Sequence, residues 1–480
     1  MEKIQNFING EFVPPYHQKY FNNINPSTGE TYCEIPNSSS EDVEKAVEAA
    51  EKAFPYWSNL SDEERGNWLI KISDGIANRM DEFVQAESRD NGKLVKLAKR
   101  VDIPRAISNF RFYGTGIQHY ASKSHHTVGV GINYTLRKPI GIVGCISPWN
   151  LPLYLFSWKI APALATGNCV VAKPSEVTPY TAFLLGKVLK EINFPKGVLN
   201  IVHGYGKDAG SEIVRHPKIT AISFTGGTET GKIISSIAAP MFKKLSLELG
   251  GKNPNIIFDD CDFDEMIKTT IHSSFSNQGE ICLCGSRIFI QREIYEKFKN
   301  AFVEKTKNLK VSFPSDENAN LGAIVSQPHY EKILSYIELA QQEGGTILAG
   351  GKTVTLEAPH DKGFYIEPTI IEGLSYDCRT NQEEIFGPVV TITPFDTEEE
   401  VLKMANSVKY GLSATIWTKD LQRAHRIANQ VEAGIIWINS WLVRDLRTPF
   451  GGVKASGIGR EGGWDALDFF TEPKNVFIPY

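Results

Sequence analysis

GIVGCIS at residues 141–147 is the first of five short apolar runs, which continue with NCVVAK at 168–173, VLNIVHG at 198–204, AISFTG at 221–226 and KLSLELG at 244–250. Helical patterns separate these runs, beginning at Trp158, at Thr178, near Ser211 and at Thr228. Strands that alternate with helices form βαβ units, and their strands pair in parallel. The stretch predicts an α/β fold with a doubly wound parallel sheet.

The flanking segments predict further elements. The N-terminus reads as two short strands joined by a turn at Asn9-Gly10, and residues 40–100 have the apolar spacing of two amphipathic helices. A third helix is expected from 103 to 120, followed by a β-ribbon in GVGINYTLRKPIG at 129–141. Alternating strand and helix patterns return between 255 and 438, which predicts a second α/β domain, and VFIPY at 476–480 predicts one more strand.

Composition excludes several classes of protein. The 480 residues suffice for two or three domains, and 51 basic against 56 acidic residues make neither nucleic acid nor an anionic membrane an expected partner. Seven cysteines without regular spacing indicate a reducing compartment, and no secretory signal is recognisable, so we expect a cytoplasmic protein. The uncharged run 140–158 contains Pro148 and Pro152, which favours a buried strand, a loop and a helix over a membrane span.

Two glycine patterns have the spacing of phosphate-binding loops. GGTETGK at 226–232 is followed by Ile233, where a P-loop has the hydroxyl that binds Mg²⁺, and GYGKDA at 204–209 fits only a relaxed dinucleotide fingerprint. Lys173 and Glu176 follow the predicted strand at 169–172. A carboxylate there favours a free ribose 2′-hydroxyl and repels a 2′-phosphate, which favours NAD over NADP, although a solvated Lys–Glu pair is an equal alternative.

Cys282 and Cys284 lie in NQGEICLCGSR at 277–287, and no Cys or His follows at metal-ligand spacing, so no zinc or other metal site is expected. From its spacing alone, Cys282 is more often an inert buried thiol than a nucleophile.

Glu248 is a single carboxylate within an apolar strand. Because burial raises the pKa of such a group, Glu248 is a candidate general base.

Seven motifs, in this order over nearly the whole chain, resemble the NAD(P)-dependent aldehyde dehydrogenase superfamily: PWN at 148–150, KPSE at 173–176, FTG at 224–226, LELGGK at 247–252, GEIC at 279–282, EEIFGP at 383–388 and PFGG at 449–452. Gly227 and Glu280 depart from the serine and glutamine that are usual in the family. The resemblance implies a homodimer or homotetramer. It also implies an NAD-binding domain at 1–120 and 140–249, a catalytic domain at 250–450, and an oligomerisation arm with the C-terminal tail at 121–139 and 451–480.

Carried over by position, the resemblance implies that Cys282 is the nucleophile, that Glu248 activates the hydrolytic water, and that Asn150 helps to stabilise the oxyanion. Cys284 is expected only to pack. Residues implied in NAD binding are Ile146, Trp149, Lys173, Glu176, Gly206, Phe224, Gly226, Gly231, Leu249, Glu384 and Phe386.

Two arginines suggest the class of substrate. Arg105 and Arg444 occupy positions where relatives that oxidise apolar aldehydes have apolar residues, and guanidinium groups bind carboxylates bidentately. The alternative is surface ion pairing with Asp102 or Asp445. Arg447 is a further candidate for the role of Arg444.

The segments around Arg105 and Arg444 resemble most the family members that oxidise 2-aminomuconate 6-semialdehyde in tryptophan and kynurenine catabolism. Those that oxidise 2-hydroxymuconic semialdehyde come next, and a broad-specificity enzyme remains an alternative. A CoA-acylating enzyme would lack Glu248, and a non-catalytic oligomer would not need Cys282, Asn150 and Glu248 together.

Overall fold

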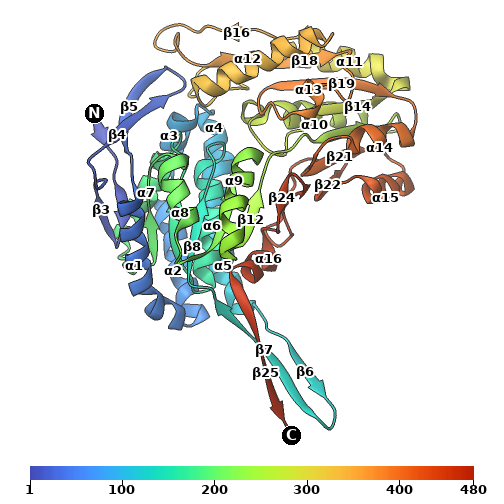
Figure 1. Cartoon of the computed structure of the whole chain (residues 1–480). Helices are drawn as coiled ribbons and strands as arrows, with labels where there is room; N and C mark the ends of the chain where they lie inside the picture. Colours follow the sequence, from blue (N-terminus) through green and yellow to red (C-terminus); the bar gives the residue numbers. More distant parts are fainter.

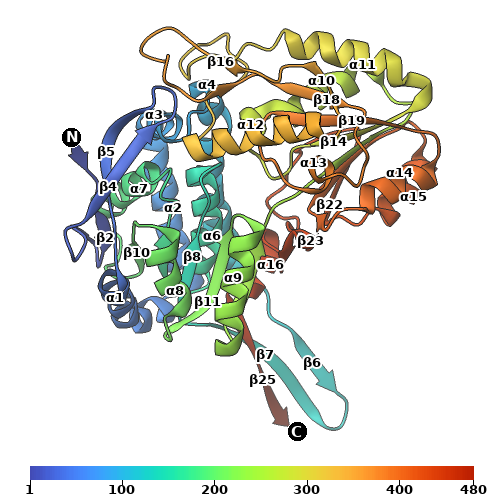
Figure 2. The ribbon, with the colours of Figure 1, turned by 45° about the horizontal axis from the view of Figure 1, so that its top comes forward.

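The computed structural model describes residues 1–480 and contains two α/β bodies and a projecting ribbon. In Figure 1 the first body is blue to green, the second is yellow to orange, and the ribbon extends from the first body with the C-terminus near its tip. The ribbon also projects in the turned view of Figure 2. The predicted α/β class is confirmed.

The first body is built on an eight-stranded sheet. Its order is β24 (Gly457–Ile458), β12 (Lys244–Glu248), β11 (Ile219–Thr225), β8 (Ile142–Ile146), β9 (Cys169–Lys173), β10 (Leu199–Ile201), β2 (Asn6–Ile8) and β3 (Glu11–Val13). Strands β12 to β10 pair in parallel, whereas β24, β2 and β3 pair antiparallel. The chain runs outward from β8 through β9 to β10, and then returns to build β11 and β12 on the other side. This reversal between β8 and β11 opens a crevice at the carboxyl ends of these strands, where ligands bind in such sheets.

Helices cover both faces of this sheet. One face is covered by α6 (Pro152–Ala165) and α7 (Tyr180–Glu191), and the other by α1 (Ser40–Asn59), α8 (Ser211–Arg215) and α9 (Thr228–Ala238). All residues of α6 are buried, because α2 (Asp62–Asn78) and α5 (Ile103–Gly116) pack on it from outside. Residues 40–100 form three long helices rather than the two predicted, since Arg79 (φ −116°, ψ 23°) interrupts the helix before α3 (Met80–Asn91).

The second body contains a seven-stranded sheet in the order β15 (Thr346–Ala349), β18 (Thr369–Glu372), β19 (Val389–Phe395), β14 (Arg287–Gln291), β13 (Pro254–Ile257), β21 (Ser413–Trp417) and β22 (Ile435–Ile438). Side chains alternate between its faces. Ile257 belongs to the core beneath α10 (Phe263–Phe275) and α11 (Arg292–Lys307), whereas Ile256 belongs to the core beneath α14 (Glu398–Asn406) and α15 (Leu421–Gln430). Two further helices are α12 (Gln327–Gln342) and α13 (Arg379–Gln382).

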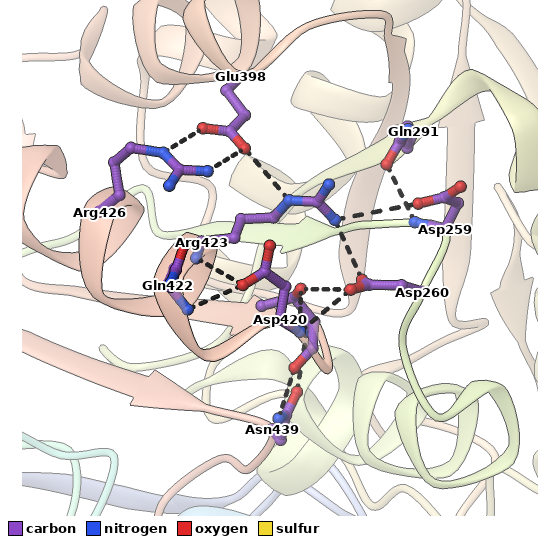
Figure 3. Close-up of polar contacts among 10 residues, drawn as sticks. Asp259, Asp260, Gln291, Glu398, Asp420, Gln422, Arg423, Arg426 and Asn439 are labelled. Carbon is purple, nitrogen blue, oxygen red and sulfur yellow. Dashed lines mark hydrogen bonds and ion pairs between the residues drawn. The ribbon is translucent and has the colours of Figure 1, made fainter.

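A polar network attaches α14 and α15 to the loop after β13 (Figure 3). The Arg423 guanidinium lies 3.2 Å from Glu398 and 3.2 Å from Asp260, and 4.6 Å from the centroid of the Phe258 ring. Glu398 also pairs with Arg426 at 2.8 Å. The network therefore joins three segments that are distant in sequence.

The ribbon consists of β6 (Ser124–Thr127), β7 (Gly131–Pro139) and β25 (Thr471–Pro479), with β7 in the centre. Segment 451–480, expected as one tail, is divided between four places, the first of which is β23 (Val453–Lys454), paired with β20 (Tyr410–Gly411). β24 joins the first sheet, α16 (Gly463–Phe469) contributes Leu467 to the first core, and only β25 lies in the ribbon. A two-residue strand such as β24 has no periodic pattern from which it could be predicted.

Short elements complete the fold: β1 (Glu2–Lys3), β4 (Tyr20–Asn25) and β5 (Glu30–Pro36) form a small sheet, and β16 (Thr353–Val354) with β17 (Tyr365–Ile366) and β20 (Tyr410–Gly411) with β23 (Val453–Lys454) form pairs. The helical turns are α4 (Val95–Leu97), two π-helices (Ala98–Asp102, Gly206–Gly210) and three 3₁₀ turns (Ile117–His119, Ala239–Met241, Ser276–Gly279). The uncharged run 140–158 forms β8, a loop and the start of α6, as predicted. None of the helices combines the length and the apolar character needed to cross a bilayer.

Candidate active site

Cys282 lies in the loop between a 3₁₀ turn (Ser276–Gly279) and β14. The backbone before it is unusual, because Asn277 (φ 50°), Gln278 (φ 57°) and Gly279 (φ 72°) are all left-handed. Gly279 lies against the backbone carbonyl of Gly387, so any Cβ at this position would collide with it. A left-handed glutamine costs free energy and persists only where its surroundings fix it. The approach to Cys282 is therefore rigidly determined.

Two cavities meet at the Cys282 side chain. The larger has a volume of about 920 Å³ and the smaller about 260 Å³, and Thr225, Leu249 and Cys282 line both. The smaller one occupies the crevice between the ends of β8 and β11, where the strand order reverses. The sulfur can therefore meet molecules from two different chambers.

Glu248 ends β12 and lines the larger cavity together with Cys282. Its side chain is buried, and neither carboxylate oxygen accepts a hydrogen bond from the chain. Burial raises the pKa of Glu248 well above its ordinary value, and the nearby Glu461 carboxylate raises it further, whereas Lys159 lowers it. The group is thus a stronger base than an ordinary carboxylate when it is ionised.

Asn150 follows β8 and lines the smaller cavity. Its Nδ2 donates one hydrogen bond to the Glu280 carbonyl at 2.9 Å, which orients the amide and leaves the second N–H free. The backbone carbonyl of Asn150 accepts hydrogen bonds from Lys93 Nζ at 3.0 Å and from Asn277 Nδ2 at 3.1 Å. The backbone N–H of Cys282 donates to no acceptor in the chain. Two hydrogen-bond donors are therefore available near the sulfur.

Burial raises the pKa of the Cys282 thiol above its ordinary value, and the carboxylates of Glu248 and Glu384 raise it further. The thiol is consequently neutral at physiological pH and needs a base to become a nucleophile.

Cys284 is buried and packs among apolar side chains, as expected. Asn253 Nδ2 donates to the carbonyls of both cysteines, at 2.7 Å and 2.9 Å, which holds the loop.

Five of the residues expected to bind the cofactor line the smaller cavity: Trp149, Gly226, Leu249, Glu384 and Phe386. The Trp149 and Phe386 rings lie edge to face, with centroids 5.3 Å apart. Glu384 Oε1 accepts a hydrogen bond from the Gly251 N–H at 2.7 Å. This arrangement offers aromatic faces and one fixed carboxylate to a planar ring and a ribose.

The other six lie outside this cavity but along the same crevice. Ile146, Lys173 and Phe224 are paired neighbours at the ends of β8, β9 and β11. Lys173 Nζ donates to Glu176 Oε2 at 3.1 Å, and the Gly206 N–H donates to Glu176 Oε1 at 3.4 Å. Gly231 lies beneath the Leu249 side chain, where a Cβ would clash. Although burial raises the pKa of Glu176, the Lys173 charge brings it below its ordinary value, so the carboxylate is ionised.

These residues fit a dinucleotide. The first intrahelical hydrogen bond of α9 runs from the Gly231 N–H to the Gly227 carbonyl, so the amides of Thr228 and Glu229 have no intrahelical acceptor. No atom lies within 4 Å of the position that a Cβ on Gly227 would take, so the start of α9 is open to a phosphate. Glu176 and Lys173 suit the ribose at the neighbouring strand ends.

Sequence reasoning missed His329 and Lys332, which also line the smaller cavity from α12. The His329 ring lies 4.9 Å from the Trp149 ring and its Nε2 lies 2.7 Å from the Phe386 carbonyl oxygen. Burial lowers the pKa of His329 to about 4, so the ring is neutral and donates to that carbonyl. In the sequence these two residues show only a spacing of three positions, which places them on one face of a helix. Ordinary surface residues have the same spacing, so it could not identify them as part of the site.

Arg105 on α5 and Arg444 in the loop 439–449 both line the larger cavity with Cys282. Neither forms an ion pair, because Asp102 pairs with Lys93 at 3.0 Å and Asp445 pairs with Arg447 at 2.6 Å. The surface ion-pair alternative is therefore wrong, and Arg447 is already neutralised. Arg100, which sequence reasoning missed, lines the same cavity.

The family model for the aldehyde dehydrogenase family matches residues 12–476. The chain belongs to the aldehyde dehydrogenase family. It is 52% identical over 480 residues to a 2-aminomuconic semialdehyde dehydrogenase from Danio rerio, covering 99% of this chain and 98% of that protein.

Two further comparisons agree in family. A 2-hydroxymuconic semialdehyde dehydrogenase from Pseudomonas sp. (strain CF600) is 45% identical over 484 residues, covering 100% of both chains. The solved NAD⁺ complex of an aldehyde dehydrogenase from Bacillus cereus is 40% identical, with a TM-score of 0.96, and the match covers 100% of this chain and 97% of that chain.

Proposed function

We propose that this protein oxidises a carboxylate-bearing semialdehyde, 2-aminomuconate 6-semialdehyde, to 2-aminomuconate, with NAD as the hydride acceptor. The observation that carries the proposal is one cavity that contains both the Cys282 thiol and the two candidate arginines, Arg105 and Arg444, neither of which has a carboxylate partner. The names of several relatives support the same substrate, since they are 2-aminomuconic semialdehyde dehydrogenases.

In the first half of the reaction, Cys282 attacks the aldehyde carbon after its thiol proton has been transferred to the Glu248 carboxylate. The thiohemiacetal oxyanion accepts hydrogen bonds from the free N–H of Asn150 and from the Cys282 backbone N–H. Such a preorganised donor contributes about 3 kcal/mol to transition-state stability. The chain thus holds both the base and the donors beside the reacting carbon.

When bound, NAD supplies the acceptor for the hydride that leaves the former aldehyde carbon. Trp149, Glu384 and Phe386 would hold its nicotinamide end in the smaller cavity, opposite the substrate. Glu248 first releases the thiol proton to solvent and then takes a proton from a water molecule, whose oxygen attacks the thioester carbon. The C–S bond breaks, the acid leaves, and the Cys282 thiolate recovers a proton from Glu248. The net change is aldehyde, water and NAD converted to acid, NADH and a proton.

NAD is favoured over NADP by the ionised Glu176 carboxylate, which repels a 2′-phosphate. A CoA-acylating reaction is disfavoured by Glu248, which activates water for hydrolysis. The second candidate substrate is 2-hydroxymuconic semialdehyde, because the relative from Pseudomonas carries that name and the carboxylate ends of the two substrates are alike.

The deciding experiment compares kcat/KM, from NADH absorbance, for 2-aminomuconic semialdehyde, 2-hydroxymuconic semialdehyde and hexanal. We expect a strong preference for the two carboxylated substrates, with the amino compound first. In Arg105→Ala and Arg444→Ala the KM for both carboxylated substrates should rise by about tenfold or more. The matched control is Arg111→Ala, because Arg111 lies on α5 like Arg105 but pairs with Asp74 and does not line the cavity. An unchanged KM in both arginine variants, or a wild-type preference for hexanal, contradicts the assignment.

The ribbon supports a homo-oligomer, either a dimer or a tetramer, as part of the proposal. It exposes an apolar surface that includes Val128, Val130, Ile132, Phe477 and Ile478. A neighbouring subunit that covers this surface and the ribbon edges would remove it from water. Light scattering that gives a monomeric mass would contradict this.

We also assign the chain to the cytoplasm, because its seven cysteines are all free thiols.

A further inference from the structure

Tyr154 is an aromatic residue of α6 whose ring lines the larger cavity, although only 6% of the residue is exposed. Its backbone carbonyl accepts hydrogen bonds from Ser157 Oγ at 2.9 Å and from Asn109 Nδ2 at 3.1 Å. Because α6 is buried along its whole length, the position of this ring is fixed by the core of the first body. Nothing in the proposed mechanism uses it.

The Tyr154 side chain contacts both candidate substrate arginines. The Arg105 guanidinium lies 5.6 Å from the centroid of the Tyr154 ring, within the range of a cation–π interaction. Arg444 Nη1 donates a hydrogen bond to Tyr154 Oη at 3.0 Å, and its guanidinium also lies 3.9 Å from the centroid of the Phe450 ring. One rigid ring therefore fixes two long, flexible side chains that come from distant segments.

The hydroxyl hydrogen of Tyr154 is not used within the protein. Its oxygen accepts from Arg444, and it donates to no acceptor in the chain. A phenol is both a donor and an acceptor, so one O–H donor remains beside the two guanidinium groups. Three donor groups, namely the two guanidinium groups and the Tyr154 hydroxyl, consequently line the same part of the larger cavity.

The charges around this wall favour an anion. Of the carboxylates that line the cavity, Asp445 is paired with Arg447 at 2.6 Å and Glu461 is paired with Lys159 at 2.6 Å. Glu248 belongs to the end of the cavity at Cys282, on β12. The charge of Arg105 acts on Asp445 and that of Arg444 acts on Glu248, but neither arginine forms an ion pair with a carboxylate of the chain, so both guanidinium groups remain free to pair with a substrate carboxylate.

We propose that Tyr154 is a substrate-binding residue that orients the guanidinium groups of Arg105 and Arg444 and donates its hydroxyl hydrogen to the substrate carboxylate. This inference rests on the proposed function, because it requires a carboxylate-bearing aldehyde in the larger cavity. Tyr154 then distinguishes substrates by their charged end without contacting the aldehyde carbon.

The test is Tyr154→Phe, which keeps the ring and removes the hydroxyl, assayed with 2-hydroxymuconic semialdehyde and with hexanal. We expect the KM for the carboxylated substrate to rise about tenfold, which corresponds to about 1.4 kcal/mol, while its kcat stays within about twofold. Both parameters for hexanal should be unchanged. Tyr154→Leu, which also removes the cation–π contact, should raise the KM for the carboxylated substrate further.

The matched control is Tyr113→Phe, because Tyr113 on α5 is a buried tyrosine whose hydroxyl has no hydrogen-bond partner and which does not line the cavity. Its KM for both substrates should equal that of the wild type. Since KM does not depend on the fraction of active protein, partial misfolding of a variant cannot imitate the expected result.

The outcomes separate the two proposals. If wild type prefers the carboxylated substrate but Tyr154→Phe has the same KM, the role of Tyr154 is overturned and the proposed function stands. Equal losses on both substrates would make Tyr154 a determinant of cavity shape and also overturn the role. If wild type shows no preference for the carboxylated substrate, both proposals fail together.

Discussion

Replacing Glu248 with glutamine separates the two halves of the proposed reaction. The amide has nearly the shape of the carboxyl group but cannot accept a proton from water. We therefore expect Glu248→Gln to form the thioester and NADH once per site and then to stop at hydrolysis. Thiol attack also slows, but the thiol can lose its proton to solvent as the pH is raised.

The size of the effect follows from the other carboxylates in the cavity. Glu461 is held by Lys159 at 2.6 Å and Asp445 by Arg447 at 2.6 Å, so neither is available as a substitute base. Loss of a general base without a substitute slows the step by about 10²–10⁴-fold. A thousandfold loss corresponds to a barrier raised by about 4 kcal/mol.

The assay is rapid mixing of Glu248→Gln with NAD and 2-hydroxymuconic semialdehyde at pH 8 to 9, with NADH absorbance as the readout. We expect a burst close to one NADH per active site, followed by turnover at least a hundredfold slower than in wild type. Mass spectrometry of the quenched protein should find the acyl group on Cys282. Turnover at the wild-type rate would refute the assignment of Glu248 to hydrolysis, whereas a slow reaction without a burst would show that the loss of Glu248 limits thiol attack.

The same variant gives a prediction for stability. In the unfolded chain Glu248 ionises near its ordinary pKa of 4.5, whereas burial raises its pKa in the folded protein. The folded state is therefore progressively destabilised as the pH rises from 4.5 through the raised pKa. Glu248→Gln should melt at a higher temperature than wild type at pH 8, and the difference should vanish below pH 4. A difference that grows at acid pH would contradict the assigned direction.

Three further predictions concern other parts of the molecule. Arg423→Met should lower the free energy of unfolding by about 1–2 kcal/mol, because it leaves Asp260 without its ion-pair partner and Glu398 with Arg426 alone. The control is Arg292→Met, which removes an exposed ion pair with Asp396 outside the network, and an equal loss in both variants would contradict the role of Arg423. Glu176→Gln should lower the KM for NADP by about tenfold, because it removes a charge that repels the 2′-phosphate, and an unchanged NAD-to-NADP ratio would exclude that role. Cys284→Ser should retain turnover within about threefold, since Cys284 only packs; loss of NADH formation in this variant would indicate that the wrong thiol had been assigned.

Local patterns predicted the elements of the fold well where each element is long enough to have a pattern. The runs at 141–147 and 221–226 became β8 and β11, and the single carboxylate in the apolar run at 244–248 became the end of β12. The break at Arg79 was not predicted, because the apolar spacing continues through it. The pairing of β24 with β12 depends on contacts between residues two hundred positions apart, which no local pattern records.

The candidate site was predicted where chemistry is concentrated in a motif. Cys282, Glu248 and Asn150 lie in such motifs. Tyr154 does not, because an aromatic residue on an apolar helix is most often part of the core. Its contacts with Arg105 and Arg444 arise only when α6, α5 and the loop 439–449 are brought together.

Because the two chambers share only Thr225, Leu249 and Cys282, they can be blocked separately. A reversible ligand confined to the larger chamber leaves the smaller one open, and the reverse also holds. Two such inhibitors are therefore expected to act almost independently of each other when combined. An electrophile that modifies the shared sulfur obstructs both chambers with one bond, so it should compete with either ligand.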